Sequence, residues 1–198
     1  ASPSNQVTDS SGHGTFVAGI IGATGSNGMG VIGGAPGVTL LPVEVLDCTG
    51  AGTTADAAAG ILYAARMGAQ VINLSFGGAE PSMTLQEAIV TATGTFGAVV
   101  VAASGNQGTR GVTYPARYRQ VIAVGASDRN SPDARASFSN WGPEVDVVAP
   151  GVDLVSTVPQ ALCDGRWSCP AGQPYSLASG TSFAAAQVAA LAALIRSH

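Results

Sequence analysis

Short apolar runs alternate along this chain with longer segments in which apolar residues recur at helical spacing. Apolar runs of this length are typical of strands covered on both faces, because no position has to meet water. We therefore predict five buried strands, at Val38–Leu46, Gln70–Phe76, Ala98–Ala103, Val121–Ala126 and Val145–Ala149.

Helical spacing marks three segments between and after those runs. Thr54–Met67 follows a capping threonine and stops at Gly68, Ser82–Thr95 starts at a capping serine, and the last helix begins near Thr181 and ends at about Arg196. Strands that alternate with helices predict an α/β fold with a mostly parallel sheet and helices on both faces. In such sheets functional groups collect beyond the carboxyl ends of the strands.

Composition narrows the function classes. Apolar residues make up 46% of the 198 residues and charged residues 10%, which argues against disorder, and the 27 glycines fit many tight turns. The net charge is −4 with no basic runs, so we expect no nucleic-acid partner, and no apolar stretch is long enough to span a membrane. The N-terminus has no initiator Met and no signal or transit segment, as in a mature secreted chain or a fragment.

The first candidate for chemistry is His13, in the segment Gly12-His13-Gly14-Thr15 at the start of a predicted small-residue helix. The flanking glycines leave its imidazole open to a cleft, where it can act as a general base near neutral pH. A solvent-exposed histidine at a helix cap is the alternative, and this motif alone does not decide between them.

The second candidate is Ser182, which follows Gly180 and Thr181 in the first turn of the last predicted helix. Free N–H groups and a partial positive charge at a helix N-terminus favour an oxyanion forming beside this serine. A plain Ser/Thr cap is the alternative. The motif is not the Gly-x-Ser-x-Gly elbow of α/β-hydrolases, in which the serine also precedes the histidine along the chain.

The third candidate is Asn106, in the segment Ala103-Ser104-Gly105-Asn106 that follows a predicted buried strand. From that position its side-chain amide can donate a second hydrogen bond to an oxyanion. A turn asparagine beside a glycine is the alternative.

Three cysteines bear on the compartment. Cys163 and Cys169 lie in one polar loop, where a local disulfide would suit an oxidising environment. Two free surface thiols are the alternative, and Cys48 is left over in either case.

Taken in the order His13, Asn106, Ser182, the three motifs resemble the subtilase family of serine endopeptidases. The resemblance runs from about Asp9 to Ile195 and implies a subtilisin-like three-layer α/β fold, with one catalytic domain over residues 1–198. Supporting segments, the last of them closest to the proteinase K and aqualysin side of the family, are Asn73-Leu74-Ser75-Phe76-Gly77-Gly78, Tyr114-Pro115-Ala116, Phe138-Ser139-Asn140-Trp141-Gly142, Ala149-Pro150-Gly151 and Leu46-Asp47-Cys48-Thr49-Gly50-Ala51-Gly52.

The resemblance implies that Ser182 is the nucleophile, His13 the general base and Asn106 the oxyanion donor, beside the backbone N–H of Ser182. It also implies a peptide or protein substrate that lies extended between two backbone segments. Small or apolar pocket walls then predict a broad specificity for an apolar residue before the cut bond. The implied substrate-binding residues are Gly50, Ala51, Gly52, Ser75, Phe76, Gly77, Ala103, Ser104 and Gly105.

One family feature does not appear in the sequence: the Asp-Ser/Thr-Gly segment with the triad aspartate, which precedes the histidine. Asp9 matches a different, turn-forming aspartate, so we do not assign it to the triad. We expect this chain to lack the N-terminal strand and triad Asp and to be a poor protease by itself, because the tautomer of His13 is not fixed. The alternative is a subtilase-like pseudoenzyme or peptide-binding domain that never had the aspartate.

The resemblance implies no catalytic cofactor but allows a structural calcium ion. Asp146 and the carbonyl groups of Arg119 and Val121 match a family ligand set, and oxygen ligands suit a hard cation. A solvated aspartate at the start of a strand is the alternative.

The resemblance also bears on the cysteines and the partners. In aqualysin-like relatives the cysteine at Cys48 is paired with one at the position of Ser10, so we expect Cys48 to be free and Cys163 to pair with Cys169. We expect an extracellular monomer that interacts with a propeptide or with the N-terminal segment of its own domain.

Overall fold

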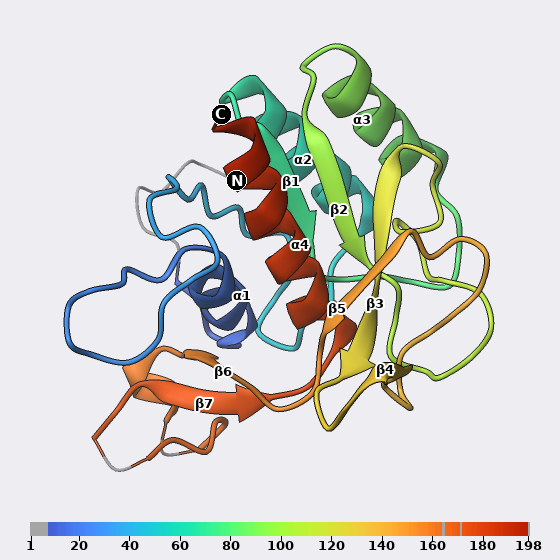
Figure 1. Ribbon diagram of the computed structural model, residues 1–198. Coiled ribbons are helices and arrows are strands. Elements are labelled where there is room, and N and C mark those ends of the chain that lie inside the picture. Colours follow the sequence, from blue (N-terminus) through green and yellow to red (C-terminus); the bar gives the residue numbers. More distant parts are fainter. Residues whose placement is uncertain (1–7, 164, 171, 198) are drawn as a thin grey trace.

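The computed structural model describes residues 8–163, 165–170 and 172–197, and it has the expected α/β architecture (Figure 1). No helix in these residues is long and apolar enough to cross a membrane. The elements in chain order are α1 (His13–Gly22), α2 (Thr54–Arg66), β1 (Val71–Leu74), α3 (Met83–Gly94), β2 (Val99–Ala103), β3 (Val121–Asp128), β4 (Ser131–Arg135), β5 (Val147–Pro150), β6 (Leu154–Thr157), the 3₁₀ turn η1 (Gln160–Leu162), β7 (Tyr175–Ala178) and α4 (Thr181–Arg196).

The main sheet is mostly parallel, as predicted. β1 pairs with β2, β2 with β3 and β3 with β5, all in parallel, and only β4 joins β3 in the antiparallel direction. β6 and β7 form a separate antiparallel hairpin. This hairpin lies against α1, because the hydroxyl groups of Ser156 and Thr157 donate hydrogen bonds to the carbonyl oxygens of Phe16 and Thr15.

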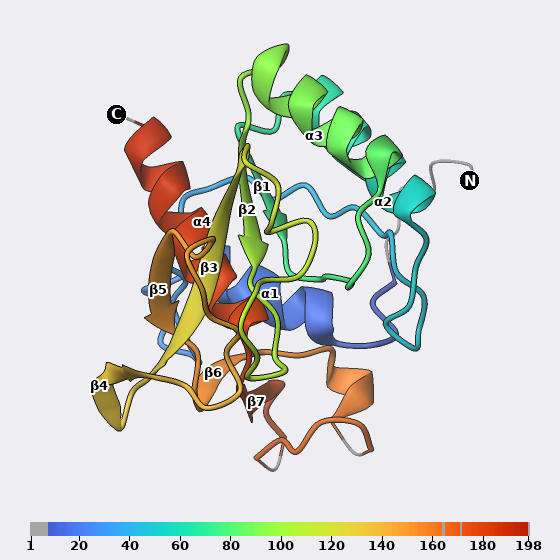
Figure 2. The same ribbon diagram turned by 90° about the vertical axis from the view of Figure 1, so that its right-hand side faces the viewer.

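Helices cover both faces of the sheet (Figure 2). Alternate residues of β2 enter two different cores: Val100 and Ala102 pack with α2 and α3, whereas Val101 and Ala103 pack with α4. This alternation is the two-residue period of a strand that is buried on both sides. The residues of α4 that contact the sheet are small, namely Ala184, Ala185 and Ala189.

The predicted strand at Val38–Leu46 is wrong. The segment lies outside every strand, and Leu40 and Leu41 are 41% and 40% exposed. The reason is that no described strand pairs with it: a groove separates it from β1, so its apolar residues line that groove instead of a sheet. The other four predicted strands are present, and so are the three helices predicted from their spacing and the small-residue helix predicted at His13. The cap residues Thr53 and Ser82 accept hydrogen bonds at the starts of α2 and α3.

The contact of α4 with the sheet gives the first testable prediction. Ala185 is fully buried, so Ala185→Leu should destabilise the fold by about 1–3 kcal/mol, the usual cost of overpacking a core. Urea denaturation followed by circular dichroism measures the change. Ala59→Leu is the matched control, because Ala59 lies on the exposed face of α2 and its replacement should change stability by about 0.5 kcal/mol or less. Equal effects of the two changes would contradict the packing described above.

Candidate active site

His13 begins α1 on a turn that is organised by Asp9. One carboxylate oxygen of Asp9 accepts hydrogen bonds from the backbone N–H groups of Ser11 and Gly12, and the other accepts from the N–H and hydroxyl of Thr15, both at 2.7 Å. Burial raises the pKa of Asp9, but these hydrogen bonds outweigh it and leave the pKa below its usual value. The carboxylate is therefore committed to the turn, as expected for a turn-forming aspartate.

The imidazole of His13 is half-buried beside the ring of Phe183, with 5.8 Å between ring centroids. Burial lowers the pKa of His13 below its ordinary value of 6.5, and the nearby charge of Asp9 raises it by less. His13 is consequently neutral near pH 7 and can accept a proton.

Ser182 lies in the first turn of α4, where that helix meets the carboxyl end of β1. Its hydroxyl donates a hydrogen bond to the carbonyl oxygen of Ser75 at 3.1 Å, and the hydroxyl of Ser75 donates to the carbonyl oxygen of Ser182 at 2.7 Å. Asn73 donates in turn to the hydroxyl of Ser75. This reciprocal pair fastens α4 to the end of β1. The described hydrogen bonds do not join Ser182 to His13.

Asn106 is held at the start of α4 by Thr181. Its side-chain oxygen accepts hydrogen bonds from the backbone N–H of Thr181 at 2.9 Å and from the Thr181 hydroxyl at 2.8 Å. With that oxygen occupied, the Nδ2 group faces Gly180, where an added Cβ would lie 3.6 Å from it. The exposed amide of Asn106 and the backbone N–H of Ser182, which takes part in none of the described hydrogen bonds, are two free donors at one helix start.

Two residues that support Asn106 were missed by the sequence analysis. Thr181, which the sequence analysis placed only at the start of the last helix, is fully buried, and its hydroxyl also accepts a hydrogen bond from the N–H of Gly105. Asn140 is 3% exposed, donates from its backbone to the carbonyl of Gly105, and accepts from the N–H of Gln107. Buried polar side chains satisfied by backbone groups rigidify a loop, but a sequence does not reveal which distant N–H groups will meet them.

The structure brings only part of the predicted substrate-binding set together. Gly50, Ser75, Phe76 and Gly77 line the same groove as His13. Ala51 and Gly52 are exposed beside it, in the loop that follows Asp47. The side chains of Ala103 and Ser104 are buried, so only backbone at the end of β2 is available there, and Gly105 adopts the left-handed conformation with φ of 110°.

The groove has a volume of about 880 Å³ and runs along the free edge of β1. Its opposite wall is the segment Val38–Leu46. Its remaining walls come from α1, α2 and α4, from the turn at residues 8–11, from the loop at residues 47–50, and from Arg166 and Trp167. The side-chain oxygen of Asn73, which lines this groove, is buried without a hydrogen-bond partner. A buried acceptor without a donor is unfavourable, so the groove suits an occupant that brings N–H groups.

The calcium site expected at Asp146 stays a prediction. One carboxylate oxygen of Asp146 accepts a hydrogen bond from the N–H of Ala123 at 2.8 Å. Calcium takes about six to eight oxygen ligands, which can include water molecules beside a carboxylate and the carbonyls of Arg119 and Val121. Within the described ranges, no three His, Cys, Asp or Glu side chains are close enough together to hold a metal ion.

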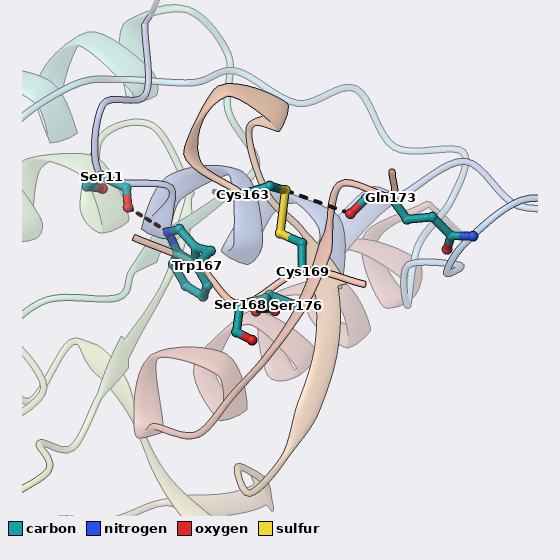
Figure 3. Close-up of a disulfide and its surroundings, with 7 residues drawn as sticks. All are labelled: Ser11, Cys163, Trp167, Ser168, Cys169, Gln173 and Ser176. Atoms are coloured by element: carbon teal, nitrogen blue, oxygen red, sulfur yellow. Dashed lines mark hydrogen bonds between the residues drawn. A yellow bond between two sulfur atoms is a disulfide. The ribbon is translucent and has the colours of Figure 1, made fainter. Parts of the chain in front are cut away.

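The predicted disulfide between Cys163 and Cys169 is present, with 5.3 Å between the two Cα atoms (Figure 3). Cys48 is the free cysteine of the described chain and is exposed, as expected.

The environment of His13 gives a prediction that NMR can test. A titration of the His13 ring should give a pKa below 6.5, and Asp9→Asn should lower it further by removing a favourable negative charge. Because the folded state binds this proton more weakly than the unfolded chain, the stability linked to His13 is present above pH 6.5 and is lost as the pH falls below that value. Asp47→Asn is the control. A His13 pKa at or above 6.5 would contradict the burial.

Comparisons with known proteins show the family of this chain. A sequence profile described as the subtilase family, peptidase S8, matches residues 1–198. Subtilisin Savinase of Lederbergia lenta is 45% identical over 98% of this chain and 65% of its own length, and M-protease of Shouchella clausii is 45% identical over 98% of this chain and 46% of its own. The chain thus spans between about half and two thirds of the length of these relatives.

A solved structure is also similar. A protease from Pseudoalteromonas arctica superposes with a TM-score of 0.82 and 38% sequence identity, covering 93% of this chain and 58% of that one. The family profile matches the whole chain, and the chain is 45% identical to Subtilisin Savinase. The chain therefore belongs to the subtilase family.

Proposed function

We propose that this chain carries the nucleophile, the base and the oxyanion donors of a serine endopeptidase that works through an acyl-enzyme. The observation that carries the proposal is the start of α4, where Ser182 and the Asn106 amide that Thr181 anchors leave two N–H donors free. The neutral imidazole of His13 lies beside the ring of Phe183, the residue that follows Ser182. The proteases to which the chain is similar support the same reaction class.

The proposed reaction starts with attack of Ser182 Oγ on the carbonyl carbon of a peptide bond while His13 takes the hydroxyl proton. The negative charge moves to the carbonyl oxygen, which accepts hydrogen bonds from Asn106 Nδ2 and from the backbone N–H of Ser182. The C–N bond then breaks, His13 returns the proton to the leaving amine, and water hydrolyses the acyl-serine in a second round. The Ser182 hydroxyl must first turn from Ser75 to His13.

We further propose that the orienting carboxylate of His13 comes from an extended segment that occupies the groove along β1. The free edge of β1, the unpaired segment Val38–Leu46 and the unpartnered oxygen of Asn73 each suit a paired strand. Asp9 cannot supply this carboxylate without releasing the turn before His13. The occupant would be the N-terminal segment of the same domain.

The proposed substrate is an extended peptide, hydrogen-bonded between Gly50–Gly52 and Ser75–Gly77. A broad preference for an apolar residue before the cut bond follows from the small and apolar walls of that site. We propose an extracellular location, supported by the Cys163–Cys169 disulfide, and a monomer that folds with a propeptide or its N-terminal segment. A structural calcium ion at Asp146 would need oxygen ligands beyond the three residues predicted for it.

A peptide-binding domain without catalysis is the second candidate. One observation favours it: the Ser182 hydroxyl is bonded to Ser75 and Asp9 is committed to its turn, so the described residues alone do not form a triad. The two functions differ in whether Ser182 becomes acylated.

The nucleophile is tested by an active-site-directed fluorophosphonate. We expect the probe to label the full-length natural chain, and Ser182→Ala to abolish labelling, because the phosphonate attaches to the serine oxygen. Ser179→Ala is the matched control, since this serine lies three residues away and bonds to Asp153 instead. Labelling that survives in Ser182→Ala would refute the assignment, and no labelling of the natural chain would favour the peptide-binding domain.

The oxyanion donor is tested by Asn106→Ala. We expect kcat to fall about 10²- to 10³-fold, a magnitude measured for loss of such an asparagine in a subtilisin and not obtained from this structure, while KM changes little. Asn130→Ala, an exposed asparagine in another loop, should leave kcat unchanged. A fall in kcat of less than about tenfold for Asn106→Ala would argue against a donor role.

The groove is tested by comparing the 198-residue chain with the full-length natural chain. We expect the shorter chain to hydrolyse peptides about 10⁴-fold more slowly, the loss seen when a triad aspartate is replaced. The upstream segment added as a separate peptide should restore part of the rate. Equal rates for both chains would show that a group among the described residues orients His13.

A further inference from the structure

The loop between β6 and β7 carries the disulfide and is not explained by the proposed reaction. The disulfide between Cys163 and Cys169 closes a short loop that carries Trp167 (Figure 3). Arg166 lies next to Trp167 in the same loop. The backbone N–H groups of Arg166 and Trp167 both donate to the carbonyl oxygen of Leu162, and Ser176 of β7 donates its hydroxyl hydrogen bond to the carbonyl of Ser168. This Cys163–Cys169 loop is thus a small, internally hydrogen-bonded unit that carries two large side chains.

Trp167 reaches from the Cys163–Cys169 loop to the turn before His13. Its indole N–H donates to the carbonyl oxygen of Ser11 at 2.9 Å. Its ring stacks on Phe16, with centroids 5.3 Å apart and planes at 18°, and Phe16 is fully buried in α1. Gly12 lies directly under the indole, since an added Cβ there would collide with it. The tryptophan therefore covers the turn and fixes one of its carbonyl groups.

Arg166 joins two loops that are distant in sequence. Its guanidinium donates to the carbonyl oxygen of Ser10 at 3.2 Å and to that of Cys48 at 2.8 Å. Ser10 belongs to the turn before His13, and Cys48 to the loop that leads into Gly50. One side chain therefore links the two loops. Its hydrogen bonds come from a charged donor, and such bonds are about twice as strong as those between neutral groups.

We propose that the Cys163–Cys169 loop is a positioning clamp. In it, Arg166 and Trp167 fix the position of the turn before His13 relative to the loop Asp47–Gly52. The clamp acts on backbone and touches neither the nucleophile nor the oxyanion donors. Only the expected effect of the clamp on catalysis rests on the proposed function, because the coupling of the two loops is a property of the fold.

Hydrogen–deuterium exchange on the full-length natural chain tests the coupling directly. Arg166→Ala should speed amide exchange in both loops, over residues 8–15 and 46–52, since both lose the shared partner. Trp167→Phe keeps a ring on Phe16 but loses the indole N–H, so exchange should rise only over residues 8–15. The double variant Cys163→Ser/Cys169→Ser should repeat the pattern of Arg166→Ala.

The matched control is Arg129→Ala. Arg129 is exposed and also donates from its guanidinium to a backbone carbonyl, that of Asp153, but it belongs to another loop. Its loss should leave exchange over residues 8–15 and 46–52 unchanged. Unchanged exchange over either stretch in Arg166→Ala would overturn the clamp, as would the same acceleration in Arg129→Ala.

Kinetics on the same variants tests the consequence for the reaction. Arg166→Ala should lower kcat/KM about 10- to 100-fold for an extended peptide, with KM raised because Gly50–Gly52 binds substrate and kcat lowered because His13 is misplaced. Arg166→Lys should recover part of the loss. Faster exchange with unchanged kinetics would overturn the positioning role, whereas an inactive natural chain would refute the proposed function and leave the exchange result to decide on the clamp.

Discussion

The close approach of α4 to the central sheet sets the position of the candidate nucleophile and of its candidate oxyanion donors. Ala184 and Ala185 are fully buried against β2 and β3, and only side chains this small let a helix lie so near a strand. The same approach brings Thr181 and Ser182 to the carboxyl ends of β1 and β2. There Thr181 meets Asn106, and Ser182 meets Ser75, through hydrogen bonds of 2.7–3.1 Å. A shift of α4 would break both sets together.

The position of His13 depends on a second set of contacts, around α1. Phe16 is fully buried and contacts Phe183, the residue after Ser182, at 4.5 Å between ring centroids. The two helices that carry the candidate base and the candidate nucleophile therefore share one aromatic cluster. Asp9 holds the turn before His13 from one side, and Trp167 holds it from the other. A base on a short turn needs such support, because a small displacement of a catalytic group has a large effect on rate.

The groove beside β1 is where this chain departs most from a closed domain. Within the described residues, β1 is an edge strand of the main sheet, and its free edge faces a space lined by apolar side chains and by the unpartnered oxygen of Asn73. An exposed strand edge is a template for another strand. The groove also borders His13, so whatever occupies it contacts the candidate base.

Local patterns in the sequence were sufficient to predict the helices and four of the strands, and they singled out three candidate site residues. Thr53 and Ser82 cap their helices by bonding to N–H groups three residues away, and β2 and β3 are continuous apolar runs. The hairpin of β6 and β7 escaped prediction because its short strands mix polar and apolar residues. Val38–Leu46 has the pattern of a strand but lacks a partner, and pairing is not encoded in the segment itself.

The family of the chain was thus evident from the sequence alone, and so were the candidates His13, Asn106 and Ser182, because each lies in a motif of a few adjacent residues. What only the tertiary structure decided is how these side chains are held. Thr181 anchors Asn106, and Arg166 joins the loops of Ser10 and Cys48, across 75 or more residues of chain. Such contacts depend on where packing places distant backbone groups, and no local pattern records that.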